Sequence, residues 1–157
     1  MSRRPRRALI DEMGTAMRLF MAHAVLYQDA VATRAGMHST DLQCLGLLSL
    51  EGPMTPRELS RLTSLTAGGA ITGVIDRLEA AGLGHRVRDE IDRRRVLVTP
   101  NTDAIMRRVG PVYGRVGARW NAYLATLTDD QIALATEIIT QATTINREEV
   151  EALRSAQ

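Results

Sequence analysis

The stretch of residues 55–100 constrains the fold more than any other part of the chain. It opens with Thr55-Pro56-Arg57-Glu58, a capping-box pattern with proline at the first helical position, which predicts a helix start. A short turn through residues 63–65 leads to a second helix start at Thr66, and Gly82 is placed to end that helix. The order therefore predicts two helices joined by a tight turn.

A charged hairpin follows the second helix. Residues 85–88 and 95–98 are predicted to form two short strands, which the polar turn at residues 89–94 connects. Helix, turn, helix and hairpin in this order predict a winged helix-turn-helix over residues 38–100, with the hairpin as the wing. In proteins that bind double-stranded DNA, the second helix of such a motif enters the major groove and is called the recognition helix.

The predicted recognition helix has one apolar face and one face of small residues. The second face carries two glycines, Gly69 and Gly73. Each makes a helix about 1 kcal/mol less stable than alanine would, so we expect a functional reason for them. One reason is that small residues let a helix approach base edges closely. The alternative is that the glycines allow this helix to pack closely on another part of the backbone. The residues expected at DNA from this helix are Thr66, Ala67, Gly69, Ala70, Thr72, Gly73 and Arg77, and those from the helix before it are Thr55 and Arg57.

The wing is rich in arginine. All twenty basic residues of the chain are arginines, and five of them lie within residues 86–95. An arginine-rich turn beside a recognition helix is placed to reach phosphates and the minor groove, although a merely solvated hairpin is the alternative. We interpret Asp92 as a carboxylate that orients a neighbouring arginine through a charge-assisted hydrogen bond. The wing residues expected at DNA are Arg86, Arg88, Asp92, Arg93, Arg94 and Arg95.

Long amphipathic helices are predicted on both sides of this region. Residues 8–36 carry one apolar stripe, and a helix of that length spans about 40 Å. Residues 102–155 repeat the pattern, and a capping box at Thr128-Asp129-Asp130-Gln131 divides them into two helices. A further capping box, at Thr40-Asp41-Leu42-Gln43, predicts the start of a helix between the first long helix and residue 55. The flanking helices exceed what one winged helix needs for its own core, so we expect a homodimer interface. The fold class is mainly α with a small β-wing, in a single domain of residues 1–157.

Charge is unevenly distributed along the chain. The formal net charge is only +2, yet residues 128–157 contain six acidic residues and two arginines. This polarity suits a molecule with one DNA-facing side. Aromatic residues make up 3% of the chain, so base-stacking platforms are not expected. The basic start at residues 3–7 is either an arm that contacts DNA or a solubilising tail.

Catalytic, metal-binding and membrane functions find no support in the sequence. The three histidines, His23, His38 and His85, form no metal-ligand pair at helical spacing, and no nucleophile motif or phosphate-binding loop is present. Nowhere do about eighteen apolar residues run together, so no membrane span is expected. Cys44 is the only cysteine, which excludes an intrachain disulfide and fits the reducing cytoplasm. We expect a buried Cys44 thiol with no sensor role, and no enzyme activity, cofactor or metal.

Three motifs together resemble those of the MarR family, the multiple-antibiotic-resistance type of bacterial transcription regulators. They are Thr55-Pro56-x-Glu58-Leu59, Val74-Ile75-Asp76-Arg77-Leu78-Glu79-x-x-Gly82-Leu83 and Asp89-x-x-Asp92-Arg93-Arg94, and the likeness covers nearly the whole chain. The resemblance implies a homodimer held by its first and last helices, with recognition helices in successive major grooves. It also implies that Arg94 enters the minor groove with support from Asp92, and that small ligands, often phenolic, release the DNA. The wing departs from the family at Glu90, where many relatives have proline, and at the apolar Ile91.

The expected function is that of a dimeric, sequence-specific repressor whose near-palindromic operator has half-sites about 10 bp apart. A crevice for a small aromatic ligand is a further expectation, with core packing as the alternative for most of its residues. The residues that would line this crevice are Met17, Phe20, His23, Tyr27, Tyr113 and Trp120. Two other functions stay open: a winged-helix module whose arginines bind an acidic protein partner, and an architectural DNA-binding protein without a ligand.

Overall fold

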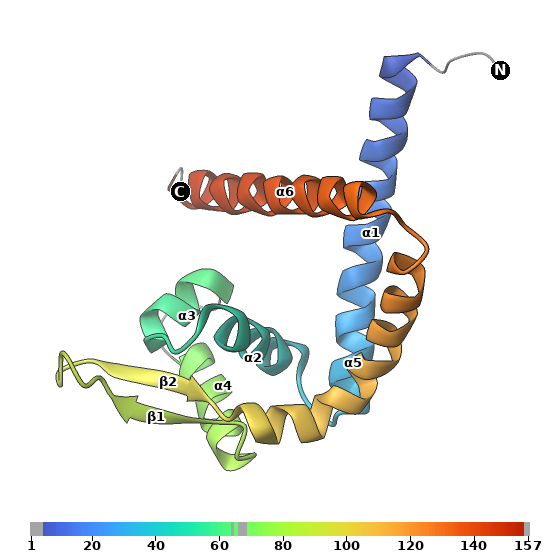
Figure 1. Ribbon diagram of the computed structural model, residues 1–157. Helices are drawn as coiled ribbons and strands as arrows, with labels where there is room; N and C mark the ends of the chain where they lie inside the picture. The colour runs from blue at the N-terminus through green and yellow to red at the C-terminus, as the bar shows by residue number, and fades with distance from the viewer. Residues whose placement is uncertain (1–4, 64, 66–68, 156–157) are drawn as a thin grey trace. The chain divides into compact units, whose positions relative to one another are not determined.

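The computed structural model describes residues 5–63, 65 and 69–155, which form helices and one small sheet (Figure 1). The chain divides into two compact units, Met1–Tyr113 and Gly114–Gln157. The predicted winged helix-turn-helix region, residues 38–100, lies within the first unit. That the whole chain acts as one domain stays a prediction.

The elements follow the predicted order. They are α1 (Arg6–Arg34), α2 (Ser39–Glu51), α3 (Pro56–Thr63), α4 (Gly69–Ala80), β1 (Gly84–Arg88), β2 (Val96–Pro100), α5 (Thr102–Leu124) and α6 (Asp129–Ser155). The predicted fold class, mainly α with a small β-wing, is confirmed. Within the described part of the chain, no helix is long and apolar enough to cross a membrane.

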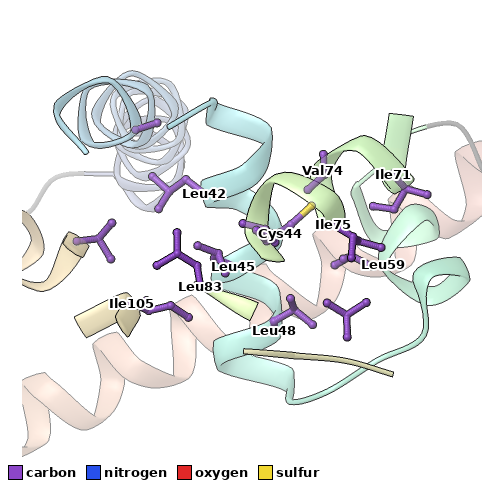
Figure 2. Packing of buried hydrophobic residues seen from close by; sticks show 14 of the residues in the cluster. Leu42, Cys44, Leu45, Leu48, Leu59, Ile71, Val74, Ile75, Leu83 and Ile105 are labelled. Atoms are coloured by element: carbon purple, nitrogen blue, oxygen red, sulfur yellow. The ribbon is translucent and has the colours of Figure 1, made fainter. Parts of the chain in front are cut away.

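The core of the first unit forms around α2. Leu45 and Leu48 on α2 are fully buried, as are Leu59 on α3 and Ile75 and Leu78 on α4. Figure 2 shows the labelled side chains of these three helices gathered in one aliphatic cluster. Burying one such side chain stabilises a fold by about 1.5–3 kcal/mol, so this cluster holds the helix-turn-helix together.

Two predicted capping boxes are confirmed. At the start of α3, the Thr55 amide donates to Glu58 Oε2 at 2.7 Å and the Glu58 amide donates to Thr55 Oγ1 at 3.2 Å. At the start of α6, the Thr128 amide donates to Gln131 Oε1 at 2.9 Å and the Gln131 amide donates to Thr128 Oγ1 at 3.3 Å. Gly82 follows α4 with φ +67°, a conformation that strains residues with a Cβ, and so ends the helix as predicted.

The capping box predicted at Thr40 is wrong. Helix α2 begins one residue earlier, at Ser39, with His38 at the N-cap and no side-chain capping bond. Thr40 therefore lies inside the first turn, where its hydroxyl is not placed to cap the helix. The Ser39 hydroxyl instead donates to a carboxylate oxygen of Asp29, so this helix start is fixed by a bond to α1.

The wing is an antiparallel pair in which Gly84 faces Pro100 and Arg88 faces Val96. The predicted hairpin is confirmed, although its second strand ends at Pro100, two residues later than expected. Met54 makes a bridge to Val98, with Val98 N donating to the Met54 carbonyl at 2.8 Å. This bridge attaches β2 to the segment before α3.

Helix α5 begins in the first unit and is tied to the end of α1. Arg108 Nε donates to the Ala35 carbonyl at 3.0 Å, and the Tyr27 hydroxyl donates to the Val112 carbonyl at 3.3 Å. The second unit contains the rest of α5 and all of α6. No residue of α6 is buried in the single chain.

Candidate nucleic-acid interface

Helix α4 presents the small-residue face that the sequence predicts. Its apolar side chains are buried, whereas Gly69, Ala70 and Thr72 are exposed and Gly73 is half-buried. A Cβ built at Gly69 meets no atom of the described residues within 4 Å, and one at Gly73 meets only the end of the Arg77 side chain at 3.5 Å. Neither glycine packs on another backbone within the described chain, so that alternative is wrong there. Thr66 and Ala67 lie outside the described residues.

Arg77 forms a bidentate ion pair with Asp41 of α2. Its Nε donates to Asp41 Oδ2 at 2.9 Å and its Nη2 donates to Asp41 Oδ1 at 2.6 Å. The Asp41 side chain is 6% exposed and that of Arg77 is 45% exposed. The hydrogen bond from Arg77 to Asp41 raises the pKa of the guanidinium. The pair locks α4 against α2, and a contact between Arg77 and a phosphate stays a prediction.

Arg86 on β1 is bound by two carboxylates of α4. Its amide donates to Glu79 Oε1 at 2.7 Å, and its Nη2 donates to Asp76 Oδ1 at 2.8 Å. Its Nη1 forms a further ion pair with Glu79. The bond to Asp76, together with the charge of Glu79, raises the pKa of Arg86. Because its charge is already compensated, Arg86 fixes the wing on α4, and its predicted role at DNA is untested.

Hydrogen bonds to two aspartates shape the turn of the wing. Asp89 Oδ1 accepts from the amides of Ile91 at 2.8 Å and Asp92 at 3.2 Å, which lowers the pKa of Asp89. Asp92 Oδ1 accepts from the Arg94 amide at 3.1 Å. The sequence predicts that Asp92 orients a neighbouring arginine, and the bond that the structure shows goes to the backbone amide of Arg94. Sequence reasoning missed the role of Asp89, although an aspartate at the start of a turn commonly makes such bonds.

A surface hollow of about 460 Å³ separates α3 from the wing. Its lining residues are Thr55, Arg57, Glu58, Arg61 and Arg95. Arg95 Nη2 donates to Glu58 Oε1 at 3.2 Å, so the hollow is basic at its rim and contains one compensated carboxylate. Bonds from the Thr55 amide and hydroxyl lower the pKa of Glu58. Thr55 is therefore engaged in capping α3.

The remaining predicted arginines are available to a ligand. Arg57, Arg88, Arg93 and Arg94 are exposed, and their guanidinium groups have no ion pair or hydrogen bond among the described residues. They lie on α3, on β1 and in the turn of the wing. The structure thus brings together an exposed helix face of small residues and a group of uncompensated positive charges. This combination suits binding to a double-stranded nucleic acid.

The residues proposed for a ligand crevice are only partly brought together. The rings of Tyr27 and Tyr113 meet edge to face, with centroids 5.9 Å apart, and partial burial raises the pKa of Tyr113. Met17 is half-buried on α1, whereas Phe20 and His23 on the same helix are exposed. Trp120 belongs to the second unit, where its ring contacts that of Tyr123.

Cys44 is fully buried, as predicted. Burial and the negative charge of Asp41 raise the pKa of its thiol to about 11. A thiol of this kind is protonated and unreactive near neutral pH. Among the described residues, no group of three His, Cys, Asp or Glu side chains could hold a metal ion.

Comparisons with known proteins agree with this architecture. Residues 37–96 match the model of the MarR family. Over 157 residues the chain is 32% identical to YcgE, an uncharacterised HTH-type transcriptional regulator of Bacillus subtilis (strain 168), covering 98% of this chain and 99% of that protein. A solved MarR family protein from Bacillus stearothermophilus has a TM-score of 0.67 at 22% identity, covering 92% of this chain and 99% of that one. The PcaV transcriptional regulator from Streptomyces coelicolor, crystallised with its natural ligand, has a TM-score of 0.51 at 23% identity, covering 92% and 98%.

Proposed function

Because the chain belongs to the MarR family of DNA-binding transcription regulators, we propose that it is a homodimeric, sequence-specific repressor of a near-palindromic operator in the cytoplasm. The observation that carries the proposal is the exposed small-residue face of α4 next to the uncompensated arginines of the wing. The family consists of transcription regulators, and the proposed activity needs no catalytic group, metal or cofactor.

In the proposed complex, α4 lies in the major groove. Its glycines let the backbone approach the base edges, and the Thr72 hydroxyl donates to or accepts from a base. Base contacts by Thr66 and Ala67, which lie outside the described residues, stay part of the proposal. Arg57 binds the phosphate backbone, Arg94 reaches into the adjacent minor groove, and the other exposed arginines of the wing bind phosphates at its rims. Phosphate contacts set the register of the protein, whereas the α4 face supplies the sequence preference.

The apolar faces of the long helices support the proposed homodimer. Large apolar side chains are exposed along both α1 and α6 of the single chain. They are Leu9, Ile10, Met13, Leu19, Phe20, Met21, Val25 and Leu26 on α1, and Leu134, Ile139, Ile145, Val150 and Leu153 on α6. Stripes of this size are rare on a monomer, and a second copy of the same chain would bury them in an isologous interface. Two recognition helices held in this way match half-sites about 10 bp apart.

A small aromatic ligand is the proposed signal for release of the operator. Tyr27 and Tyr113 supply an aromatic pair and two hydroxyl groups, and PcaV is a regulator of the same fold that was solved with its natural ligand. Aromatic edges and hydroxyls favour planar, weakly polar molecules such as phenolic acids. A screen of small aromatic acids for release of the protein from its operator tests this part separately.

Binding to selected duplexes tests the proposal. The protein is used to select its preferred duplex from a random pool, and affinity is then measured across a salt series. A DNA-binding protein that neutralises Z phosphates loses affinity with a log–log slope of about −0.9Z and keeps its preference for the selected duplex over random DNA. No preference for any duplex would favour the alternative of an acidic protein partner. Binding without sequence preference would favour the architectural alternative.

Replacement of Arg94 tests the role of the wing. Arg94 is exposed and makes no core contact, so Arg94→Ala should weaken binding about tenfold or more without unfolding the protein. The matched control is Arg34→Ala, which removes an exposed arginine from α1. Undiminished affinity of Arg94→Ala in a gel-shift titration would contradict the wing assignment.

A further inference from the structure

Ile91 is an apolar side chain in the turn of the wing that the fold itself does not use. It is 98% exposed, more than any other large hydrophobic residue described. The turn lies at the free end of the hairpin, away from the helices of the first unit (Figure 1). An isoleucine there adds nothing to the core, and full hydration of its side chain is unfavourable. Its presence is explained if a ligand covers it.

The backbone around Ile91 is fixed before any ligand binds. Asp89 Oδ1 accepts the Ile91 amide at 2.8 Å, and the Asp89 amide donates to the Arg95 carbonyl at 3.1 Å, closing the loop. On the other side, the Arg95 amide donates to the Asp92 carbonyl at 2.8 Å. These bonds hold Ile91 outward on an ordered turn, so little conformational entropy is lost when the side chain is covered.

The charges beside Ile91 indicate the kind of surface that covers it. Arg93 and Arg94 are exposed and have no side-chain partner among the described residues. Arg88 and Arg93 line one hollow together with Asp89 and Glu90, so both signs of charge lie beside the turn. An apolar tip flanked by guanidinium groups matches the minor groove of DNA, whose rims carry phosphates and whose walls are the apolar faces of deoxyribose.

We propose that Ile91 enters the minor groove of the operator beside Arg94 and packs against its sugar walls, while the other exposed arginines of the wing bind the phosphate rims. The inference rests on the proposed function and adds to it an apolar contact made by the wing. The contact buries a side chain without neutralising a charge. It therefore strengthens binding by an amount that salt does not change.

Ile91→Ser tests the contact on the duplex selected by the unaltered protein. Loss of a partly buried isoleucine should weaken binding about five- to tenfold, whereas Ile91→Leu should retain most of the affinity. The matched control is Leu50→Ser, because Leu50 is 88% exposed on α2, outside the wing. Ile91→Ser should melt at the same temperature as the unaltered protein, since its side chain packs against nothing.

The salt series separates this contact from a charge effect. Ile91→Ser should keep the log–log slope of the unaltered protein, while Arg94→Ala should make the slope shallower by about one. If the unaltered protein and Arg94→Ala behave as proposed but Ile91→Ser binds as tightly as the unaltered protein, the inference is overturned and the proposed function stands. If the unaltered protein prefers no duplex, the proposed function fails. An acidic protein captured through Ile91 without DNA affinity would overturn both.

Discussion

At the scale of single residues, ion pairs distinguish two groups of arginines on α4 and the wing. Arg77 and Arg86 are held by carboxylates of the fold, whereas Arg93 and Arg94 have no side-chain partner among the described residues. Pairing fixes a side chain and compensates its charge, so the first group positions α4 and the wing. The second group keeps its charge for phosphate.

The Asp41–Arg77 pair should show unequal losses when either partner is removed. Arg77→Ala leaves a buried carboxylate unpaired and should lower the free energy of unfolding by about 2–3 kcal/mol, whereas Asp41→Asn leaves a half-exposed arginine and should lower it by about 1 kcal/mol. Urea unfolding at one protein concentration measures both. The double variant should lose less free energy of unfolding than the two single variants lose together. Arg57→Ala, which removes an exposed arginine, is the control and should leave the stability unchanged. Fully additive losses would show that the pair contributes no coupling.

The Cys44 thiol should resist modification in the folded protein. With a pKa of about 11, only about one molecule in 10⁴ carries the thiolate at pH 7, and the side chain is fully buried. A chromogenic thiol reagent should therefore react with the native protein far more slowly than with the protein in urea. Rapid, stoichiometric labelling of the native form, or loss of DNA binding in mild peroxide, would contradict the expectation that Cys44 has no sensor role.

At the scale of elements, features set by local sequence signals can be predicted from the sequence, whereas features set by tertiary contacts cannot. The capping boxes at Thr55 and Thr128 and the helix end at Gly82 were predictable, because each depends on residues a few positions apart. The partners of Asp41 and Arg86 were not, since those bonds join residues 36 and 7–10 positions apart and depend on how α2, α4 and β1 pack. The exposed face of α4 was predicted from its small residues, whereas the backbone role of Asp92 depends on the path of the turn.

The capping box of α3 should make stability depend on acid. The pKa of Glu58 is lowered from 4.5, chiefly because the Thr55 amide donates to its carboxylate. A group with a lowered pKa stabilises the fold above its unfolded value, and that contribution is lost as the pH falls through the folded value. Between about pH 5 and pH 3, Glu58→Gln should therefore lose less stability than the unaltered protein. Glu51→Gln, at the exposed end of α2, is the control, and equal acid dependence of all three proteins would contradict the prediction.

At the scale of the whole molecule, the exposed apolar faces of α1 and α6 matter most. The first unit has its own aliphatic core, whereas no residue of α6 is buried in the single chain. A long helix with an apolar stripe and no buried residue obtains its stability from packing with a partner. The proposed homodimer supplies that partner and places two winged helix-turn-helix regions on one operator.

A charge placed on the α6 stripe should separate the dimer. Ile139 is 60% exposed, and Ile139→Glu should shift the protein towards the monomer because an unpaired carboxylate would be buried in the interface. Light scattering after gel filtration gives the mass of each species. The control is Leu50→Glu, which places the same charge on an exposed leucine of α2. An unchanged dimer mass for Ile139→Glu at micromolar concentration would exclude this face from the interface.

The attachment of Arg86 to Asp76 and Glu79 has a consequence for the kinetics of release. Because β1 is bonded to α4 through both carboxylates, we expect the proposed recognition helix and the wing to move together. We expect the two to leave their grooves in a single step, so that dissociation follows one exponential without a half-released state. A ligand that releases DNA would then have to act on the spacing between the two copies of the proposed homodimer, because within one copy the helix and the wing are bonded to each other.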